Sequence, residues 1–538
     1  MNKGKSITLN TLIHWEEFRK RIIVEGITTG FLVGLIIAIL RYILEKTNIL
    51  VITVYKILHT NPYLLTAWII FLSLIGLLLG IIVKKEPMIS GSGIPQVEGM
   101  IIGYIKVNWL RVLLLKLLGT ILAIGAGLSL GREGPCVQIG SSIGQGISRL
   151  FGRFRVEEKY LITCGASAGL AAAFNAPLAG VIFALEELHK NFSPLVLISA
   201  MVSSLTSTFV AGKLLGIKPI FNFKNLAVMP LNNYLYLILL GIIIGLCGIV
   251  FNKTLLKTQD IYNMLKIKSY MKPILPLVIS VAVGLWVPMA IGGGEGLVDT
   301  LSKNSFSLKF LILLLIVKFL FTMVSYGSGV PGGIFMPLLI IGSLIGNIYG
   351  TVIINIMHLN PIYIKDFIVF AMAGYFAAIV RAPITGSLLV TEMTGSFSHL
   401  LALSTVSITA YLSSDLFSNM PIYESLLERL PIKKKQKSIT ANKKRKTIFE
   451  MPVCVGSSLD GKKLKDISLP QNCLLVGIKR GTYELIPKGN TKILAGDYLI
   501  VLADEDKATE IREILLNMTQ NCISNVGKGN YYSQYYKD

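Results

Sequence analysis

Two related hexapeptides, Asn175-Ala-Pro-Leu-Ala-Gly180 and Arg381-Ala-Pro-Ile-Thr-Gly386, lie far apart in this chain of 538 residues. Each follows an alanine-containing apolar stretch, and each is followed at the same distance by a glutamate, Glu186 in the first case and Glu392 in the second. A chance match would not be expected to repeat the glutamate as well. The pattern predicts a duplicated half, which is typical of transporters whose interrupted helices form a site near the middle of the membrane.

The composition around these repeats is that of a membrane protein. Hydrophobic residues make up 53% of the chain, charged residues make up 15%, and the mean hydropathy is +0.64. A soluble domain carries roughly 25% charged residues. Four long runs contain no charged residue at all, namely 64–83, 231–252, 274–294 and 319–364. Because a spanning helix needs about 20 apolar residues, the last run predicts either two spans or several shorter, broken helices.

The basic residues are placed as in the cytoplasmic loops of membrane proteins. A net charge of +22 is compatible with nucleic-acid binding, but the lysines and arginines cluster beside the apolar runs, as the positive-inside rule describes. The largest cluster, Lys433–Lys446, follows the last apolar run and predicts contact with anionic lipid. No cleavable signal peptide is evident. We therefore expect a multi-pass protein of the cytoplasmic membrane with both termini in the cytoplasm, an even number of crossings and no nucleic-acid partner.

The chain divides at a basic linker. We predict a transmembrane domain over residues 1–430, the linker over 431–447, a small domain of soluble composition over 448–518, and a disordered tail over 519–538. In the small domain, 473–479 and 498–502 are expected to form strands and 506–518 a helix. The six cysteines show no close pairing, and the five histidines form no ligand motif with them, so neither a metal nor a cofactor is expected.

Three segments that combine glycine and proline interrupt apolar sequence: Gly91-Ser-Gly-Ile-Pro95, Gly131-Arg-Glu-Gly-Pro135 and Gly332-Gly-Ile-Phe-Met-Pro337. Non-helical backbone at membrane depth is tolerated where it lines a cavity, and a helix that starts there presents roughly half a positive charge. Such helix starts can bind an anion without lysine or arginine, and weakly enough for the ion to leave. The alternative is that the glycines only permit close helix packing. Three segments of one kind favour the anion site.

Glu133, in the second segment, is the most informative single residue. A carboxylate at the centre of a spanning helix costs about 2.5–3.5 kcal/mol on insertion scales, so this one either faces water in a loop or has a function. It stands beside Gly-Pro at a predicted helix start, where backbone N–H groups can bind its charge. We predict that Glu133 is a gate: it occupies the anion site itself and leaves when it is protonated or displaced.

These three segments, together with Gly165–Gly180, resemble the signature motifs of the CLC family of chloride channels and transporters, in the family's order over about residues 20–430. The resemblance implies an all-α polytopic membrane protein with two inverted repeats and broken re-entrant helices, assembled as a homodimer with one chloride pathway per subunit. The residues that match the family's chloride ligands are Ser92 (hydroxyl), Ile334 and Phe335 (backbone amides) and Tyr423 (phenolic hydroxyl), with Glu133 matching the external gating glutamate. Serine at position 92 is typical of chloride-preferring members. Cys136 departs from the threonine or phenylalanine expected after Gly-Pro.

Glu187 bears on the choice between an exchanger and a passive channel. CLC exchangers keep a second glutamate near the cytoplasm that passes protons towards the gate, and Glu187 in Leu185-Glu-Glu-Leu188 matches it. We therefore expect proton-coupled chloride exchange, with Glu187 as the proton-transfer residue. If Glu187 is an ordinary carboxylate at a helix end, the alternative is a passive chloride channel of the same fold. Lys116, alone in an apolar run, is expected to raise the potential of the pathway or to pair with a carboxylate.

The small domain resembles the RCK C-terminal (TrkA-C) domain of bacterial potassium uptake proteins, through Leu459-Asp-Gly-Lys, Ile486-Pro-Lys-Gly and Leu494-Ala-Gly-Asp497. The resemblance implies a small α/β domain that dimerises and binds a small regulatory ligand; a purely structural clamp is the alternative. A potassium transporter is disfavoured because the chain lacks a Thr-Val-Gly-Tyr-Gly filter. An enzyme is disfavoured because the sequence shows no metal or nucleophile constellation.

Overall fold

The structure is a computed structural model. It describes residues 3–153, 155–190, 193–217, 219–221, 223, 226–430, 446–471, 473–481, 483–504 and 508–520. The chain forms two compact units, Met1–Leu430 and Pro431–Asp538. Most of the predicted linker (431–445) and most of the predicted tail (521–538) lie outside the described residues.

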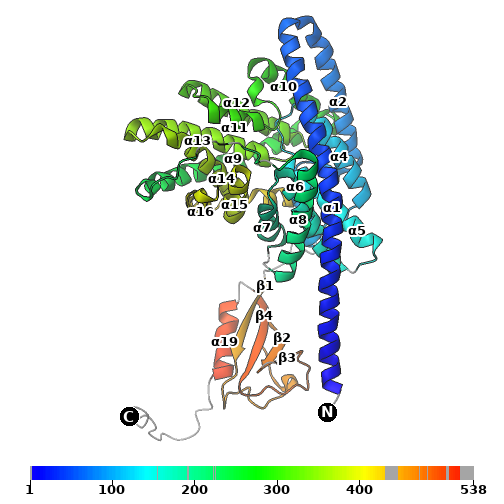
Figure 1. The fold of residues 1–538 in the computed structure, drawn as a ribbon. Coiled ribbons are helices and arrows are strands. Elements are labelled where there is room, and N and C mark those ends of the chain that lie inside the picture. Colours follow the sequence, from blue (N-terminus) through cyan, green and yellow to red (C-terminus); the bar gives the residue numbers. More distant parts are fainter. Residues whose placement is uncertain are drawn as a thin grey trace. The chain divides into compact units, whose positions relative to one another are not determined.

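The first unit is helical and consists of two consecutive halves (Figure 1). The first half contains α1 (Lys3–Thr60), α2 (Leu65–Lys85), α3 (Ile94–Ile101), α4 (Trp109–Gly125), α5 (Glu133–Leu150), α6 (Arg155–Phe174), α7 (Pro177–Phe183), a π-helical turn (Ala184–His189) and α8 (Pro194–Leu215). The second half contains α9 (Tyr234–Met264), α10 (Ile274–Trp286), α11 (Glu295–Lys303), α12 (Leu308–Gly327), α13 (Phe335–Met357), α14 (Ile364–Val380), α15 (Pro383–Thr394) and α16 (Leu400–Leu416), and α17 (Ile422–Glu428) follows. Within the described residues, 8 helical segments are long and apolar enough to cross a membrane. The charge-free run 319–364 contains the end of α12, a break, and all of α13.

The two halves cap each other's helices through the duplicated glutamates. The carboxylate of Glu392 accepts hydrogen bonds from the amides of Leu178 (3.2 Å) and Ala179 (2.7 Å) in the first turn of α7. Glu186 accepts the equivalent bonds in the first turn of α15, from the amides of Ile384 (3.3 Å) and Thr385 (2.8 Å). The first N–H groups of a helix have no partner within the helix, and a negative charge there is favourable. The repeated glutamate of the sequence is therefore a reciprocal helix cap.

Two buried lysines show the same internal symmetry. The ammonium of Lys116 on α4 donates to the carbonyls of Ile89 (2.8 Å) and Gly91 (2.7 Å), in the loop before α3. Lys318 on α12 donates to the carbonyls of Ala290 (3.0 Å) and Gly292 (2.9 Å), in the loop before α11. Each lysine therefore holds the irregular loop of its own half. The expectation that Lys116 pairs with a carboxylate is wrong within the described residues, because its ammonium group donates to backbone carbonyls.

Replacing Lys116 or Lys318 with methionine is expected to lower the thermal stability of the detergent-solubilised protein. Lys318→Met removes the hydrogen bonds to the carbonyls of Ala290 and Gly292, whereas Lys116→Met leaves only that of Ile89 without a partner, because Gly91 still accepts from the amide of Gly332. An unsatisfied buried group costs about 1–3 kcal/mol, so Lys318→Met should be the more destabilising of the two. The measurement is the midpoint of thermal unfolding, with the exposed Lys257→Met as a control that should not change it. A wild-type midpoint for Lys116→Met would show that the loop is held by other contacts.

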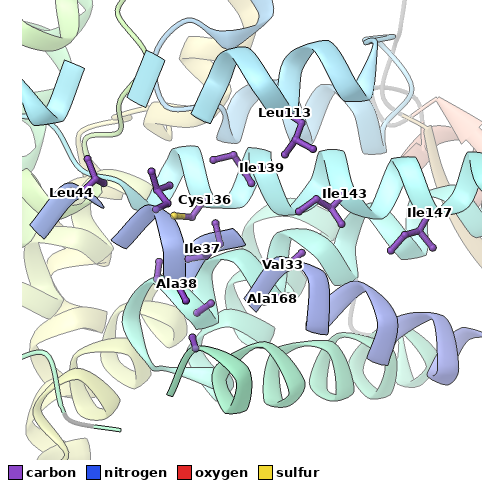
Figure 2. Close-up of a cluster of buried hydrophobic side chains, with 14 of the residues drawn as sticks. Val33, Ile37, Ala38, Leu44, Leu113, Cys136, Ile139, Ile143, Ile147 and Ala168 are labelled. Atoms are coloured by element: carbon purple, nitrogen blue, oxygen red, sulfur yellow. The ribbon is translucent and has the colours of Figure 1, made fainter. Parts of the chain in front are cut away.

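The core of the first half lies where α1 crosses α5 and α6 (Figure 2). Val33, Ile37 and Ala38 of α1 pack in one cluster with Cys136 and Ile139 of α5. Cys136 is fully buried there, so the departure from the family pattern places a small apolar side chain in a packed core. Helix α5 also lies very close to α6: a Cβ added to the α5 residue Gly140 would lie 2.0 Å from the carbonyl oxygen of Gly165. Some glycines of this half therefore do serve close helix packing.

The second unit is a four-stranded antiparallel sheet with one helix. Its elements are β1 (Lys446–Pro452), β2 (Cys473–Arg480), β3 (Tyr483–Leu485), β4 (Asp497–Asp504) and α19 (Ala508–Gln520), with the strands in the order β1-β4-β2-β3. The core is formed by inward-facing side chains such as Ile478 and Val501, and by Ile511 and Leu515 of α19. The two predicted strands and the predicted helix are confirmed, although residues 505–507 lie outside the described part.

An ion pair closes the turn before β4. Asp497 accepts hydrogen bonds from Nε (2.7 Å) and Nη2 (2.8 Å) of Arg480, and from the amide of Leu494 (2.8 Å). Burial alone would raise the pKa of Asp497, but the hydrogen bonds from Arg480 and Leu494 outweigh it and lower the pKa below the ordinary value. The carboxylate therefore contributes stability in its charged form.

We expect the stability of the second unit to fall at acidic pH because of Asp497. A carboxyl group with a lowered pKa in the folded state stabilises the fold above its unfolded pKa, about 3.9, and the contribution is lost as the pH falls through the folded-state value. Asp497→Asn should remove about 1 kcal/mol at neutral pH, since Arg480 is partly exposed to solvent. Urea unfolding of a fragment covering residues 431–538 between pH 7 and pH 3 measures both effects. Equal pH dependence in the wild type and Asp497→Asn would contradict this account.

Candidate anion site

The three glycine- and proline-containing segments meet inside the first unit, and each ends at the start of a helix. Ser92 and Gly93 precede α3, Glu133 is the first residue of α5, and Phe335 is the first residue of α13. The segments are joined by backbone hydrogen bonds. Gly131 and Gly333 donate to each other's carbonyls over 2.7 Å, while Gly91 donates to Val330 (3.2 Å) and accepts from Gly332 (3.0 Å). The predicted helix starts are therefore present, and residues from both halves form one site.

Glu133 is fully buried at this meeting point. Neither of its carboxylate oxygens has a hydrogen-bond partner among the described residues. A Cβ added to Gly131 would lie 2.3 Å from Oε2 of Glu133 and 2.9 Å from the amide nitrogen of Met336. The carboxylate therefore lies against the first turn of α13, where N–H groups are unpaired, and only a glycine at position 131 leaves space for it.

Two hydroxyl groups lie on the other side of the α5 start. Ser92 is 1% exposed and Tyr423 on α17 is fully buried, and neither hydroxyl has a hydrogen-bond partner in the part of the chain that is described. The two hydroxyls lie near each other, and Tyr423 interacts electrostatically with Glu133. A Cβ added to Gly134 would lie 2.2 Å from Oγ of Ser92, so this glycine brings Ser92 against α5. Leaving a buried polar group unsatisfied costs about 1–3 kcal/mol, which a bound ligand would recover.

The side chain of Phe335 belongs to an aromatic cluster beside the first amides of α13. Its ring lies 5.2 Å from that of Phe174, 6.2 Å from that of Phe183 and 4.5 Å from that of Phe376, measured between centroids. Ile334, the residue before it, is also fully buried. The aromatic rings keep water away from this side of the site, and electrostatic interactions with the backbone dipoles are stronger where water is excluded.

A cavity of about 310 Å³ leads to Glu133 from one side. Its lining includes Arg41, Asn48 and Arg132 from the first half and Gly293 and Glu295 from the second. Arg132 forms an ion pair with Glu295 (2.7 Å). The sequence did not indicate this partner of Arg132, because the two residues lie in different halves.

Glu187 lies in the π-helical turn after α7 and is 4% exposed. Its Oε1 has no hydrogen-bond partner within the described residues. Close by, Lys190 donates to Glu98 of α3 (2.8 Å) and to Glu424 of α17, and all three charged groups interact electrostatically with Glu187. Sequence reasoning missed this cluster. Glu98 follows the first glycine segment and Glu424 adjoins Tyr423, but no spacing in the sequence pairs them.

Comparison with known proteins agrees with this geometry. Residues 75–415 match the family described as voltage gated chloride channel, and residues 448–516 match the TrkA-C domain. The chain belongs to the CLC family of chloride channels and transporters. Its second unit is a TrkA-C domain, and both resemblances seen in the sequence are confirmed. The family consists of channels and transporters and is not an enzyme class.

Bacterial members of this CLC family are similar to the chain in sequence. It is 36% identical to the H(+)/Cl(-) exchange transporter ClcA of Yersinia pestis bv. Antiqua (strain Angola) over 367 residues, which cover 66% of this chain and 76% of the relative. It is 36% identical to ClcA of Vibrio cholerae serotype O1 (strain M66-2) over 379 residues, covering 68% and 80%. Among solved structures, a slow cyanobacterial Cl-/H+ antiporter is similar, with a TM-score of 0.73, 32% identity, and 77% of this chain and 99% of that chain covered. The chain is therefore a multi-pass membrane protein with the CLC fold.

Proposed function

We propose that this protein exchanges chloride for protons across the cytoplasmic membrane, as a homodimer with one pathway per subunit and both termini in the cytoplasm. The observation that supports this most directly is the set of buried oxygens without partners at the meeting point of α3, α5 and α13. Ser92, Glu133 and Tyr423 all belong to that set. Buried polar groups usually have hydrogen-bond partners, and an anion bound where these three meet would account for their lack of one.

Chloride would be held by hydrogen-bond donors without a full positive charge. The hydroxyls of Ser92 and Tyr423 would donate from one side, and the amides of Ile334 and Phe335 from the start of α13. The helix start adds a partial positive charge. The fully buried lysines, Lys116 and Lys318, donate from their ammonium groups to loop carbonyls, and Arg132 forms an ion pair with Glu295. Binding would therefore be strong enough to replace water and weak enough for release.

Glu133 would compete with chloride for the same donors. Its carboxylate already lies beside the amide of Met336, so a chloride ion and the charged side chain cannot both use the start of α13. Protonation removes the charge that binds Glu133 there, and the side chain then gives way to the anion. Return of the carboxylate releases the proton and closes the site, which couples the two ions.

Glu187 would exchange protons between the cytoplasm and this gate. It is buried, has an oxygen without a described partner, and interacts electrostatically with Tyr423 and with the cluster around Lys190. Lys190 is 41% exposed and Glu424 is 46% exposed, so the cluster connects the buried carboxylate to solvent. The similar proteins named H(+)/Cl(-) exchange transporters also support exchange rather than a passive channel.

Flux measurements on the full-length protein in proteoliposomes test the proposal. An outward chloride gradient should drive protons into the vesicles against their own gradient, and a proton gradient should drive chloride. Chloride flux without any proton movement, at every pH, would identify a passive channel. Crystals grown in bromide give an independent test: anomalous density should lie between Ser92, Tyr423 and the amides of Ile334 and Phe335.

We also propose that the TrkA-C unit dimerises and binds a small regulatory ligand. It has its own hydrophobic core, and the family to which it belongs is regulatory in potassium uptake proteins. Binding of a ligand by this unit would change the chloride flux of the full chain, whereas a purely structural clamp would respond to none.

A further inference from the structure

A second cavity, of about 430 Å³, lies away from the anion site. It is formed by the loop between α3 and α4, the end of α5 and the start of α6. The lining residues are Met100, Gly103, Ile105, Lys106, Gln145, Arg149, Arg153, Glu158, Lys159 and Ile162. Four of these are basic and one is acidic, so the cavity suits an anionic ligand.

Two of the four basic groups already have carboxylate partners. Arg153 forms an ion pair with Glu25 of α1, and Nε of Arg149 lies 3.7 Å from Oε1 of Glu158. Lys106 and Lys159 form no ion pair or hydrogen bond through their ammonium groups with the described residues, although both line the cavity. The cavity therefore offers two uncommitted positive charges at its wall.

The cavity also offers an acceptor for hydroxyl groups. Oε1 of Glu158 accepts a hydrogen bond from Gln145 (2.7 Å), which is 4% exposed and fixes the carboxylate in place. The other oxygen, Oε2, accepts none from the part of the chain that is described. A ligand of negative charge alone would be repelled by this carboxylate, whereas a ligand that combines a phosphate with hydroxyl groups could use both the lysines and Glu158.

The surface beside the cavity is apolar. Leu150 (76% exposed) and Phe151 (57%) lie between the two lining arginines in the sequence, and Ile102 (45%) lies on the loop that carries Lys106. Exposed side chains of this kind at the end of a membrane helix contact acyl chains, and basic pockets between membrane helices bind anionic lipid headgroups. The charged cavity and its apolar border together fit one phospholipid molecule better than a free phosphate.

We propose that this cavity binds the headgroup of an anionic phospholipid that carries hydroxyl groups, of the glycerophosphate type. Lys106 and Lys159 bind the phosphodiester, Glu158 accepts a hydrogen bond from a headgroup hydroxyl, and the acyl chains lie over Leu150 and Phe151. The site is separate from the anion pathway and does not depend on the proposed exchange function.

Binding of dioctanoyl phosphatidylglycerol to the full-length protein in detergent tests the site, by native mass spectrometry and by titration. Lys106→Gln combined with Lys159→Gln should weaken binding at least about tenfold, because each basic residue near a lipid contributes about 1 kcal/mol. The control removes two exposed lysines elsewhere, Lys257→Gln with Lys266→Gln, and should bind as the wild type does. Gel filtration of both double variants checks that they fold. Equal affinity in the two double variants would overturn the proposal.

Three further measurements separate the parts of the ligand. Dioctanoyl phosphatidylmethanol has the same charge but no hydroxyl, and the wild type should bind it several-fold more weakly than phosphatidylglycerol. Glu158→Met should lose this preference without losing affinity for phosphate, since it removes a negative charge; a preference that persists would overturn the role of Glu158. Glycerol phosphate without acyl chains should compete poorly, and competition as strong as that of the lipid would show that the site takes a soluble ligand instead.

Discussion

Glu133→Ala is expected to abolish proton coupling while chloride still crosses the membrane. The carboxylate is the only group at the meeting point of α3, α5 and α13, among the described residues, that can both bear a proton and compete with an anion. Without it the donors at the start of α13 stay available to chloride, and no proton is carried when the site opens. A positioned acid or base contributes roughly 10²–10⁴-fold to a proton transfer, so proton flux should fall to background. The measurement is the simultaneous recording of chloride and proton flux in proteoliposomes.

Glu295→Gln is a matched control for this prediction. Glu295 lines the same cavity as Glu133 and pairs with Arg132, but its side chain is 40% exposed and lies outside the buried site. This variant should keep coupled exchange, with at most a change in rate. A folded Glu133→Ala protein that moves no chloride would argue against the gate. A Glu133→Ala protein that still moves protons against their gradient would also argue against the gate.

Glu187→Gln is expected to remove proton movement and leave a slower or unchanged chloride flux. Glutamine keeps the size of the side chain and its place in the π-helical turn, but it cannot release a proton. Because Glu187 is not one of the chloride ligands that we assign, the anion site itself should bind bromide as in the wild type. A chloride gradient across proteoliposomes should then fail to drive protons at any pH.

The neighbouring glutamate supplies the control for Glu187. Glu186→Gln weakens the cap on α15, where the carboxylate accepts bonds from Ile384 and Thr385, so it should lower thermal stability while exchange remains coupled. Loss of coupling in Glu186→Gln and not in Glu187→Gln would reverse the assignment. Coupling in both variants would remove the proton-transfer role from this turn.

The local features of the fold could be predicted from the sequence because they depend on local chemistry. Glycine and proline interrupt helices wherever they stand in an apolar chain, so the starts of α3, α5 and α13 were visible in the three motifs. The repeated glutamate likewise marked the two halves. Short apolar runs marked the strands β2 and β4 of the TrkA-C unit, and a Gly-Asp turn marked the start of β4.

The pairing of residues across the two halves was decided only by the tertiary structure. The caps given by Glu186 and Glu392, the ion pair of Arg132 with Glu295, and the cluster of Lys190 all join positions whose separation in the chain says nothing about their distance in space. The use of Lys116 was also undecided, because a lone cation in an apolar run has several possible partners and only packing selects the carbonyls before α3. The sequence determined which groups are buried in the membrane; folding determined which of them were left without a partner, and those are the groups on which we base the proposed site.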